Sequence, residues 1–190
     1  MRPRVIFLPV LLFLLNLGLA ACDDDGGGSL TMTAEEQEAF DYTNYARTDP
    51  QGFAEEFLRE AHDNGTDNGA YADLMARQPV GALELSPGLF AAARAHSRDL
   101  NENCQRLQHD SCDGTIWSDR ISSYYNGGNL AENAAWGYPT GLDVVLGWII
   151  DHNIDGVGHR VALLNGDYTH VGIGLAGTYW TQDFGAGGTN

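Results

Sequence analysis

The spacing of apolar and polar positions predicts helices in the first half of the chain. Thr33 and Glu36 form a capping box, in which each side chain can satisfy a free backbone amide of the first helical turn. We expect that helix to end at Asp49-Pro50, which also begins a second helix over residues 53–61. A further helix begins at Ser86-Pro87, and its apolar stripe predicts that it belongs to the core.

The second half combines strand and helix patterns. Residues 130–136 alternate with the period of a strand, which places Glu132 among apolar neighbours on one face. Residues 139–152 have a helical period with apolar positions on two faces, and Asp151 ends one of these rows. Residues 171–184 are typical of an antiparallel hairpin. Helices that come before a small antiparallel sheet predict an α+β fold.

The N-terminus has the pattern of a bacterial lipoprotein signal. A positively charged start and an apolar run lead to Leu19-Ala-Ala-Cys22, a lipobox whose Cys22 would be lipidated after cleavage. The apolar run is interrupted and is short for a membrane span of about 20 residues, and an ordinary secretory signal is the other alternative. We therefore expect a signal peptide over 1–21, a lipidated tether over 22–32 and one domain over 33–190.

The charge balance excludes one class of partner. The formal net charge is -16 at pH 7, and loss of residues 1–21, which contain Arg2 and Arg4, would make the chain more acidic still. Such a surface repels phosphate backbones, and the sequence contains no basic stripe. We therefore expect no nucleic-acid partner.

Two cysteines remain beyond the lipobox, Cys104 and Cys112. In an oxidising compartment they most simply form one local disulfide. The alternative is a cysteine nucleophile paired with His109, but nothing near either cysteine would lower the pKa of its thiol. We interpret the pair as a clip that holds the loop of His109.

Four polar residues come from separate places in a segment that is otherwise rich in small and apolar residues. They are His109, Glu132, Asp151 and His159. A carboxylate on an inward-facing position needs a partner, because an isolated buried charge is too costly to keep. Two imidazoles and two carboxylates suit zinc or another divalent cation, with positions left open for water. A structural hydrogen-bond network without an ion explains the same four residues equally well.

Several stretches resemble the CAP superfamily of cysteine-rich secretory proteins, antigen 5 and pathogenesis-related proteins, in its bacterial branch. In chain order the matching pieces are Asn44-Tyr-Ala-Arg-Thr-Asp-Pro50, Leu89-Phe-Ala-Ala-Ala-Arg-Ala-His-Ser97, His109, Glu132-Asn133, Trp148 to Asp151, Gly158-His-Arg160 and Val171-Gly-Ile-Gly174. They cover nearly all of residues 33–185, and their order and spacing make the match specific. The resemblance implies an α-β-α sandwich with a three-stranded antiparallel sheet.

The resemblance also implies a role for the four polar residues. In CAP proteins the corresponding His, Glu, Glu and His line a central cavity, and here the positions are His109, Glu132, Asp151 and His159. Asp151 stands where the family usually has Glu. Its side chain is one methylene shorter, which favours a contact to a histidine over direct metal ligation.

Two functions follow from the resemblance. CAP proteins are known for binding small lipids, sterols and partner proteins, which implies a binding or interaction module anchored in the cell envelope outside the cytoplasm. The alternative is a metal-dependent hydrolase of peptide or ester bonds, with a metal-bound water and a carboxylate as general base. No H-E-x-x-H or G-x-S-x-G signature supports that alternative in the sequence.

Lipidation of Cys22 is testable by substitution. Cys22→Ala should release the protein from the membrane fraction, because the acyl chains that anchor it would no longer be attached. Fractionation of cells followed by immunoblotting measures this. Unchanged membrane retention of the variant would show that Cys22 is not the anchor.

Overall fold

The computed structural model of the protein describes residues 31–152 and 155–188. The predicted signal peptide, Cys22 and most of the tether lie outside these residues. Helix α1 (Ala34–Thr48) begins with the expected capping box, in which Thr33 and Glu36 exchange hydrogen bonds with each other's backbone amides. Asp49 ends α1, and its side chain caps the next helix, in which Pro50 is the first residue.

In chain order the α-helices of the described residues are α1, α2 (Pro50–Phe53), α3 (Arg59–Asp63), α4 (Ala70–Ala76), α5 (Pro87–Asp99), α6 (Trp117–Tyr124), α7 (Gly141–Ile150) and α8 (Gly158–Leu163). The four predicted helices are present, the second of them divided between α2 and α3, and the structure adds α4, α6 and α8, which the sequence patterns did not predict. Short π-helical turns continue α2 over Ala54–Leu58 and α5 over Leu100–Cys104. In the described ranges, no helix has both the length and the apolar character needed to cross a bilayer.

The sheet has one strand more than we expected. Its strands are β1 (Glu84–Leu85), β2 (Gly128–Trp136), β3 (His170–Ala176) and β4 (Tyr179–Ala186), in the spatial order β1-β3-β4-β2. The three long strands are antiparallel, as predicted. The added strand, β1, pairs parallel to β3 over two residues, which is too short to show an alternating pattern in the sequence.

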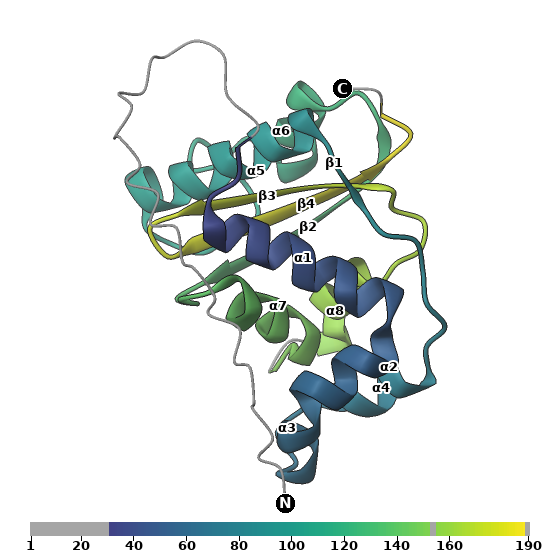
Figure 1. The fold of residues 1–190 in the computed structure, drawn as a ribbon. Coiled ribbons are helices and arrows are strands. Elements are labelled where there is room, and N and C mark those ends of the chain that lie inside the picture. Colours follow the sequence, from purple (N-terminus) through teal and green to yellow (C-terminus); the bar gives the residue numbers. More distant parts are fainter. Residues whose placement is uncertain (1–30, 153–154, 189–190) are drawn as a thin grey trace, which may run out of the picture.

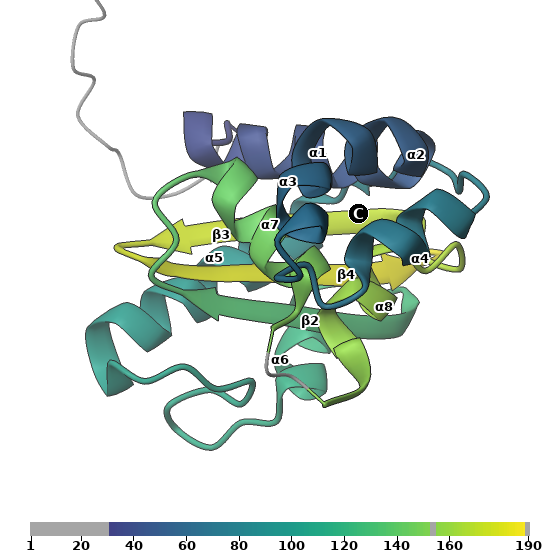
Figure 2. The same cartoon turned by 90° about the horizontal axis from the view of Figure 1, so that it is seen from below.

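Helices cover both faces of the sheet, as the two views of the ribbon show (Figure 1, Figure 2). Helices α5 and α6 lie on one face, and α1 and α7 lie on the other. The predicted α+β class and the three-layer arrangement are confirmed.

Glycines let α5 approach the sheet closely. Ideal Cβ atoms built at Gly172 and Gly174 would lie 2.0 Å from the backbone of Leu89 and 2.4 Å from that of Ala93. Neither contact leaves room for a methyl group. The alternation on β3 therefore places two glycines against α5 and turns Val171 and Ile173, both 0% exposed, toward the opposite layer.

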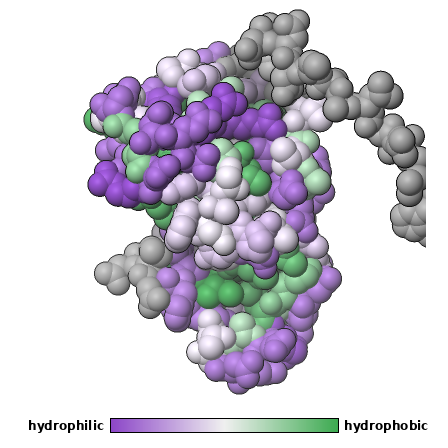
Figure 3. Space-filling view, turned by 90° about the vertical axis from the view of Figure 1, so that its left-hand side faces the viewer, coloured by the Kyte–Doolittle hydropathy of each residue, from purple (hydrophilic) through white to green (hydrophobic). Residues whose placement is uncertain are grey.

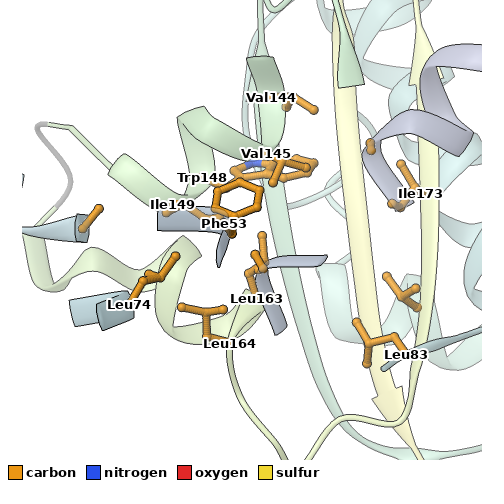
Figure 4. Close-up of a cluster of buried hydrophobic side chains, with 14 of the residues drawn as sticks. Phe53, Leu74, Leu83, Val144, Val145, Trp148, Ile149, Leu163, Leu164 and Ile173 are labelled. Atoms are coloured by element: carbon orange, nitrogen blue, oxygen red, sulfur yellow. The ribbon is translucent and has the colours of Figure 1, made fainter. Parts of the chain in front are cut away.

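The main core lies between the sheet and the layer that contains α1 and α7. Trp148 packs beside Val145, Phe53 and Leu163 in this core (Figure 4). Trp148 is 1% exposed, which explains the second apolar row that the sequence shows on α7.

A buried arginine ties α1 to three segments distant in sequence. Arg47 is 1% exposed and donates hydrogen bonds to the backbone oxygens of Gly81, Leu163, Asn165 and Tyr168. Burial lowers the pKa of Arg47 to about 10, so the guanidinium remains charged at neutral pH. Carbonyl oxygens, rather than a carboxylate, stabilise this charge.

The contact between α5 and β3 provides a test of the fold. Gly172→Ala should destabilise the protein by about 3 kcal/mol, because the new methyl group would force backbone apart from backbone. The matched control is Gly81→Ala, whose Cβ would meet nothing within 4 Å. Urea unfolding of both variants measures the difference. Equal stabilities would contradict the close approach of α5.

Candidate functional site

Glu132 lies near the middle of β2 and holds His109, which precedes α6. Nδ1 of His109 lies 2.8 Å from Oε1 of Glu132, and the side chains are 52% and 1% exposed, respectively. Because a carboxylate oxygen accepts, the ring proton of the neutral histidine lies on Nδ1. The carboxylate therefore orients the ring and leaves Nε2 as the nitrogen that His109 can offer to a ligand.

Arg120 of α6 bonds to both members of this pair. Its Nη2 donates to Oε2 of Glu132, and its Nη1 donates to the backbone oxygen of His109 at 2.9 Å. The Arg120 side chain is 7% exposed, so these bonds are largely shielded from water. One guanidinium thus fixes the loop of His109 against the strand that carries Glu132.

A second carboxyl group stands directly across the sheet from Glu132. Asp183 on β4 is the register partner of Glu132 and is 0% exposed. No N–H or hydroxyl in the described part of the chain reaches its carboxyl oxygens, and its hydrogen bond is with the carboxyl group of Glu132. Two carboxyl groups can share a hydrogen bond only when one of them carries a proton.

Burial sets the protonation of this cluster. It raises the pKa of Glu132 to about 7, with the charge of Arg120 opposing the rise. Burial and the charge of Glu132 raise the pKa of Asp183 well above its ordinary value. Burial and the charge of Arg120 lower the pKa of His109, and they lower that of buried His96 to about 4. Near neutral pH the imidazoles are neutral, and the carboxyl pair retains a proton.

A second His–carboxylate pair forms where α7 ends. Oδ1 of Asp151 lies 2.7 Å from Nδ1 of His159. Oδ2 of Asp151 accepts a hydrogen bond from the backbone N–H of His159 at 2.9 Å. Gly156, with φ of 80°, allows the chain to turn back so that α8 begins beside Asp151. His159 is 20% exposed and, like His109, has Nε2 free to meet a ligand.

The other side of Asp151 is held by the segment before α4. The Asn68 side chain donates to the backbone oxygen of Asp151 at 2.9 Å, and Arg160 donates to the backbone oxygen of Asn68 at 3.0 Å. Arg160 also lies 3.7 Å from Asp73, an ion pair that the sequence pattern did not specify. These contacts fix the end of α7 and therefore the position of His159.

The two histidines line one cavity. It has a volume of about 410 Å³ and is bounded by β2, α8 and the residues before α6. A neighbouring cavity of about 550 Å³ shares His159 with the first. Its apolar lining residues include Leu107, Trp136, Tyr138, Leu146 and Ile150. In Figure 3 apolar surface gathers in the lower part of the face, below a more polar region.

The comparison with protein families decides the relationship. The model of the cysteine-rich secretory protein family, CAP, matches residues 40–184. The chain belongs to the CAP family. The match includes all four of the predicted site residues.

Relatives of this CAP domain occur in Bacillus subtilis. The chain is 33% identical over 112 residues to the uncharacterized membrane protein YlbC of Bacillus subtilis, covering 58% of this chain and 31% of that protein. It is 32% identical over 111 residues to the uncharacterized protein YkwD of the same organism, covering 57% of this chain and 41% of that protein. The chain thus spans less than half the length of either relative.

A solved structure has the same fold. An extracellular protein of Bacillus anthracis with an SCP domain superposes with a TM-score of 0.55 at 23% sequence identity, covering 83% of this chain and 45% of that one. At this level of identity the similarity supports the CAP fold alone.

The CAP domain divides the predicted four-residue site into two pairs. His109 bonds to Glu132, and His159 bonds to Asp151, while both histidines face one cavity. The pairing of Asp151 with a histidine agrees with the expectation from its short side chain. Among residues 31–152 and 155–188, no three His, Cys, Asp or Glu side chains come together in a way that would hold a metal ion.

A disulfide closes the segment that carries His109. Cys104 and Cys112 are bonded, with Cα atoms 5.6 Å apart. The backbone N–H of Cys112 also donates to the Asp99 side chain at 2.7 Å, which joins the clip to the end of α5. The prediction of a local disulfide beside His109 is confirmed in the structure.

Sequence reasoning missed Arg120 and Asp183. Arg120 lies on a short helix beside an apolar stripe of Trp117, Ile121 and Tyr124, but an arginine next to such a stripe is usually exposed, so its burial was not predicted. Asp183 belongs to the predicted hairpin, but its position opposite Glu132 depends on the pairing of β2 with β4, which are far apart in sequence. An acidic residue inside an otherwise apolar and neutral strand was the available signal.

The carboxyl pair predicts a stability that depends on pH. The folded-state pKa of Glu132, about 7, exceeds the unfolded value of 4.5, so the folded state holds more protons between these values. Stability contributed by this group therefore falls as pH rises through that window. Asp183→Asn removes one of the two acids, and at about pH 8 the variant should be more stable than the parent by on the order of 1–3 kcal/mol.

The extra stability of Asp183→Asn should be smaller at about pH 5, because at that pH the Glu132–Asp183 pair of the parent protein keeps its proton. Thermal unfolding at several pH values measures this stability difference. The low pKa of His96 gives stability an opposite dependence on pH, but it affects the parent and the variant equally and so cancels in the difference. Exposed Asp41 supplies the control substitution Asp41→Asn. A stability difference that does not change with pH would rule out the shared proton.

Proposed function

We propose that this CAP domain is a binding module outside the cytoplasm, anchored in the cell envelope by lipid on Cys22. Its ligand, a small lipid or a segment of a partner, occupies the cleft between His109 and His159. The Bacillus anthracis structure is titled an extracellular protein, and the YlbC relative is named a membrane protein, which supports this location.

The observation that carries the proposal is the pair of oriented histidines on one cavity. Each ring is fixed through Nδ1 by a buried carboxylate, so Nε2 is pre-oriented to accept or donate a hydrogen bond. The adjoining cavity is mostly apolar and shares His159. A ligand with a polar and an apolar part matches this division, because each part would meet a lining of its own kind.

Zinc remains a prediction of the sequence, and the residues as arranged do not fit a resident ion. Both carboxylates are engaged with imidazole Nδ1 atoms, so the cleft offers two Nε2 atoms where zinc sites use three or four protein donors.

The hydrolase alternative has weaker support. The residues that line the two cavities include no Ser, Thr or Cys that could act as a nucleophile. Hydrolysis would need a water activated by His109 or His159, and a buried carboxylate holds each imidazole ring in a fixed orientation. A binding function gives a role to both cavities, whereas hydrolysis gives a role only to the cavity lined by His109 and His159.

Substitution of both histidines tests the binding proposal. His109→Ala combined with His159→Ala should weaken binding of a fluorescent fatty acid at least about tenfold, because its carboxylate would lose both hydrogen-bond partners. His62→Ala is the matched control, since His62 pairs with Asp67 outside the cleft. Unchanged binding by the double variant would refute the assignment of the polar end.

The same variants test the zinc prediction by calorimetry at about pH 7.5 and about pH 5.5. Ligation by imidazole must weaken as pH falls, because only the neutral ring can bind a metal. Zinc binding that survives the double substitution and ignores pH would place the ion elsewhere. Turnover of ester or peptide substrates that is lost with His159→Ala would favour the hydrolase.

A further inference from the structure

The carboxylates behind the two cleft histidines decide what these rings can bond to. Nδ1 of His109 lies 2.8 Å from Glu132, and Nδ1 of His159 lies 2.7 Å from Asp151. A carboxylate accepts a hydrogen bond, so the proton of the neutral ring is on Nδ1 and Nε2 keeps its lone pair. Each neutral ring therefore presents an acceptor to whatever enters the cleft.

The two rings come to the cleft from opposite layers of the fold. Glu132, which holds His109, points toward the layer of α5 and α6, where Arg120 binds it. Asn133, the next residue of β2, points the other way, and its amide donates to the backbone oxygen of His159 at 3.1 Å. Both histidines line the cavity of about 410 Å³. A group with several hydrogen-bond donors in this cavity would therefore meet an acceptor on each side.

The buried arginines at the site are balanced by carboxyl groups. Arg120 is 7% exposed and bonds to Glu132, which shares a proton with Asp183, so the remaining negative charge of that pair faces the guanidinium. Arg160 is 3% exposed and lies 3.7 Å from Asp73. Neither arginine therefore leaves the cleft with an excess of positive charge.

Further carboxylates make the surroundings of the cleft acidic. Burial lowers the pKa of His109, and the charge of nearby Asp110 opposes that lowering. Asp143 lines the cavity of about 550 Å³. Exposed Arg106 precedes the lining residue Leu107, and its guanidinium bonds to a neutral side-chain amide. It adds one positive charge against two carboxylates, in a chain with a net charge of -16, so the cleft attracts cations.

Apolar side chains extend from the second cavity onto the surface. Leu107 and Trp136 line the cavity of about 550 Å³ and are 45% and 59% exposed. A small ligand enclosed in the cavity would leave the outer surfaces of both side chains in water. A polypeptide that crosses the cleft would cover them, and buried aromatic side chains are typical of protein interfaces. This rim therefore suits a partner larger than a single lipid.

We propose that the cleft binds a segment of a partner protein through a lysine or arginine side chain held between His109 and His159. An apolar residue of the same segment occupies the neighbouring cavity beside Trp136. The proposal rests on the proposed binding function and names the class of its ligand.

The chemistry of the cleft favours this ligand over the alternatives. An ammonium or guanidinium group has only donors, which matches two acceptors, whereas a fatty-acid carboxylate can bond to these nitrogens only when the rings take up a proton. The carboxylates around the cleft favour the same charge. Repulsion between like charges also disfavours a second copy of this acidic chain in the same place.

The test uses the full chain in detergent solution and a phage-displayed library of nine-residue peptides. Peptides that bind are resynthesised with one lysine acetylated or one arginine replaced by citrulline, which removes the charge and changes the shape of the side chain little. At the residue that enters the cleft, this change should weaken binding at least about tenfold. Fluorescence polarisation measures each dissociation constant.

Substitution of both histidines shows whether that residue lies between the rings. His109→Ala combined with His159→Ala should weaken binding of the unmodified peptide at least about tenfold, and neutralising the basic residue should then have little further effect. Two changes that remove the same contact are not additive. His62→Ala is the control, because His62 also pairs with a carboxylate, that of Asp67, but lines neither cavity.

The apolar contact is tested at Trp136. Trp136→Ala should weaken peptide binding about tenfold, while the fold is retained because the side chain is largely exposed. Met75→Ala on α4 is the control, because Met75 is exposed and lines neither cavity. Equal effects of these two substitutions would contradict the placement of the apolar residue.

The outcomes separate this proposal from the binding function on which it rests. A library that yields no binder, or peptides whose affinity does not depend on a basic residue, would overturn the proposal. So would a basic residue whose effect is the same in the double histidine variant as in the parent. Fatty-acid binding that is lost in that variant would still leave the binding function standing, whereas failure of both probes to bind would overturn both.

Discussion

The packing of this domain depends on the buried guanidinium of Arg47, whose charge is stabilised by hydrogen bonds to backbone carbonyl oxygens. Arg47 reaches from α1 to carbonyl groups before β1, at the end of α8 and before β3. Removing a guanidinium from water is costly, and several well-aligned carbonyl oxygens compensate for much of that cost. The same bonds fix where α8 ends, and α8 carries His159. A structural interaction remote from the cleft therefore helps to position one of its two histidines.

The cleft itself follows from the way the layers meet at the edge of β2. Glu132 and Asn133 are neighbours in sequence, yet the pleat sends one side chain to each layer. Each layer contributes one histidine, His109 or His159, to the same cavity. Each ring is oriented by an almost completely buried carboxylate, Glu132 for His109 and Asp151 for His159. Burial and the charge of Arg120 lower the pKa of His109, and burial raises the pKa values of Glu132 and Asp183, so this pair is arranged for hydrogen bonding rather than for strong charge.

Local signals accounted for most of the elements. The capping box at Thr33, proline at the start of α5 and the alternation in β2 and the hairpin all describe interactions within a few residues. Their structures agree with the predictions because such interactions do not depend on the rest of the chain. Strand β1 was missed because its two residues gain their structure only from β3. The disulfide was expected from compartment and spacing alone.

The sequence by itself determined the α+β class, the family resemblance and the four polar residues, because periodicity, caps and ordered motifs are written along the chain. Only the tertiary structure decided how those residues are used. It bonded Glu132 to His109 and Asp151 to His159, brought Arg120 to the first pair and placed Asp183 across from Glu132. The reason is physical: strand register and layer packing join residues from distant parts of the chain, and no local pattern specifies which distant side chain will share a buried site.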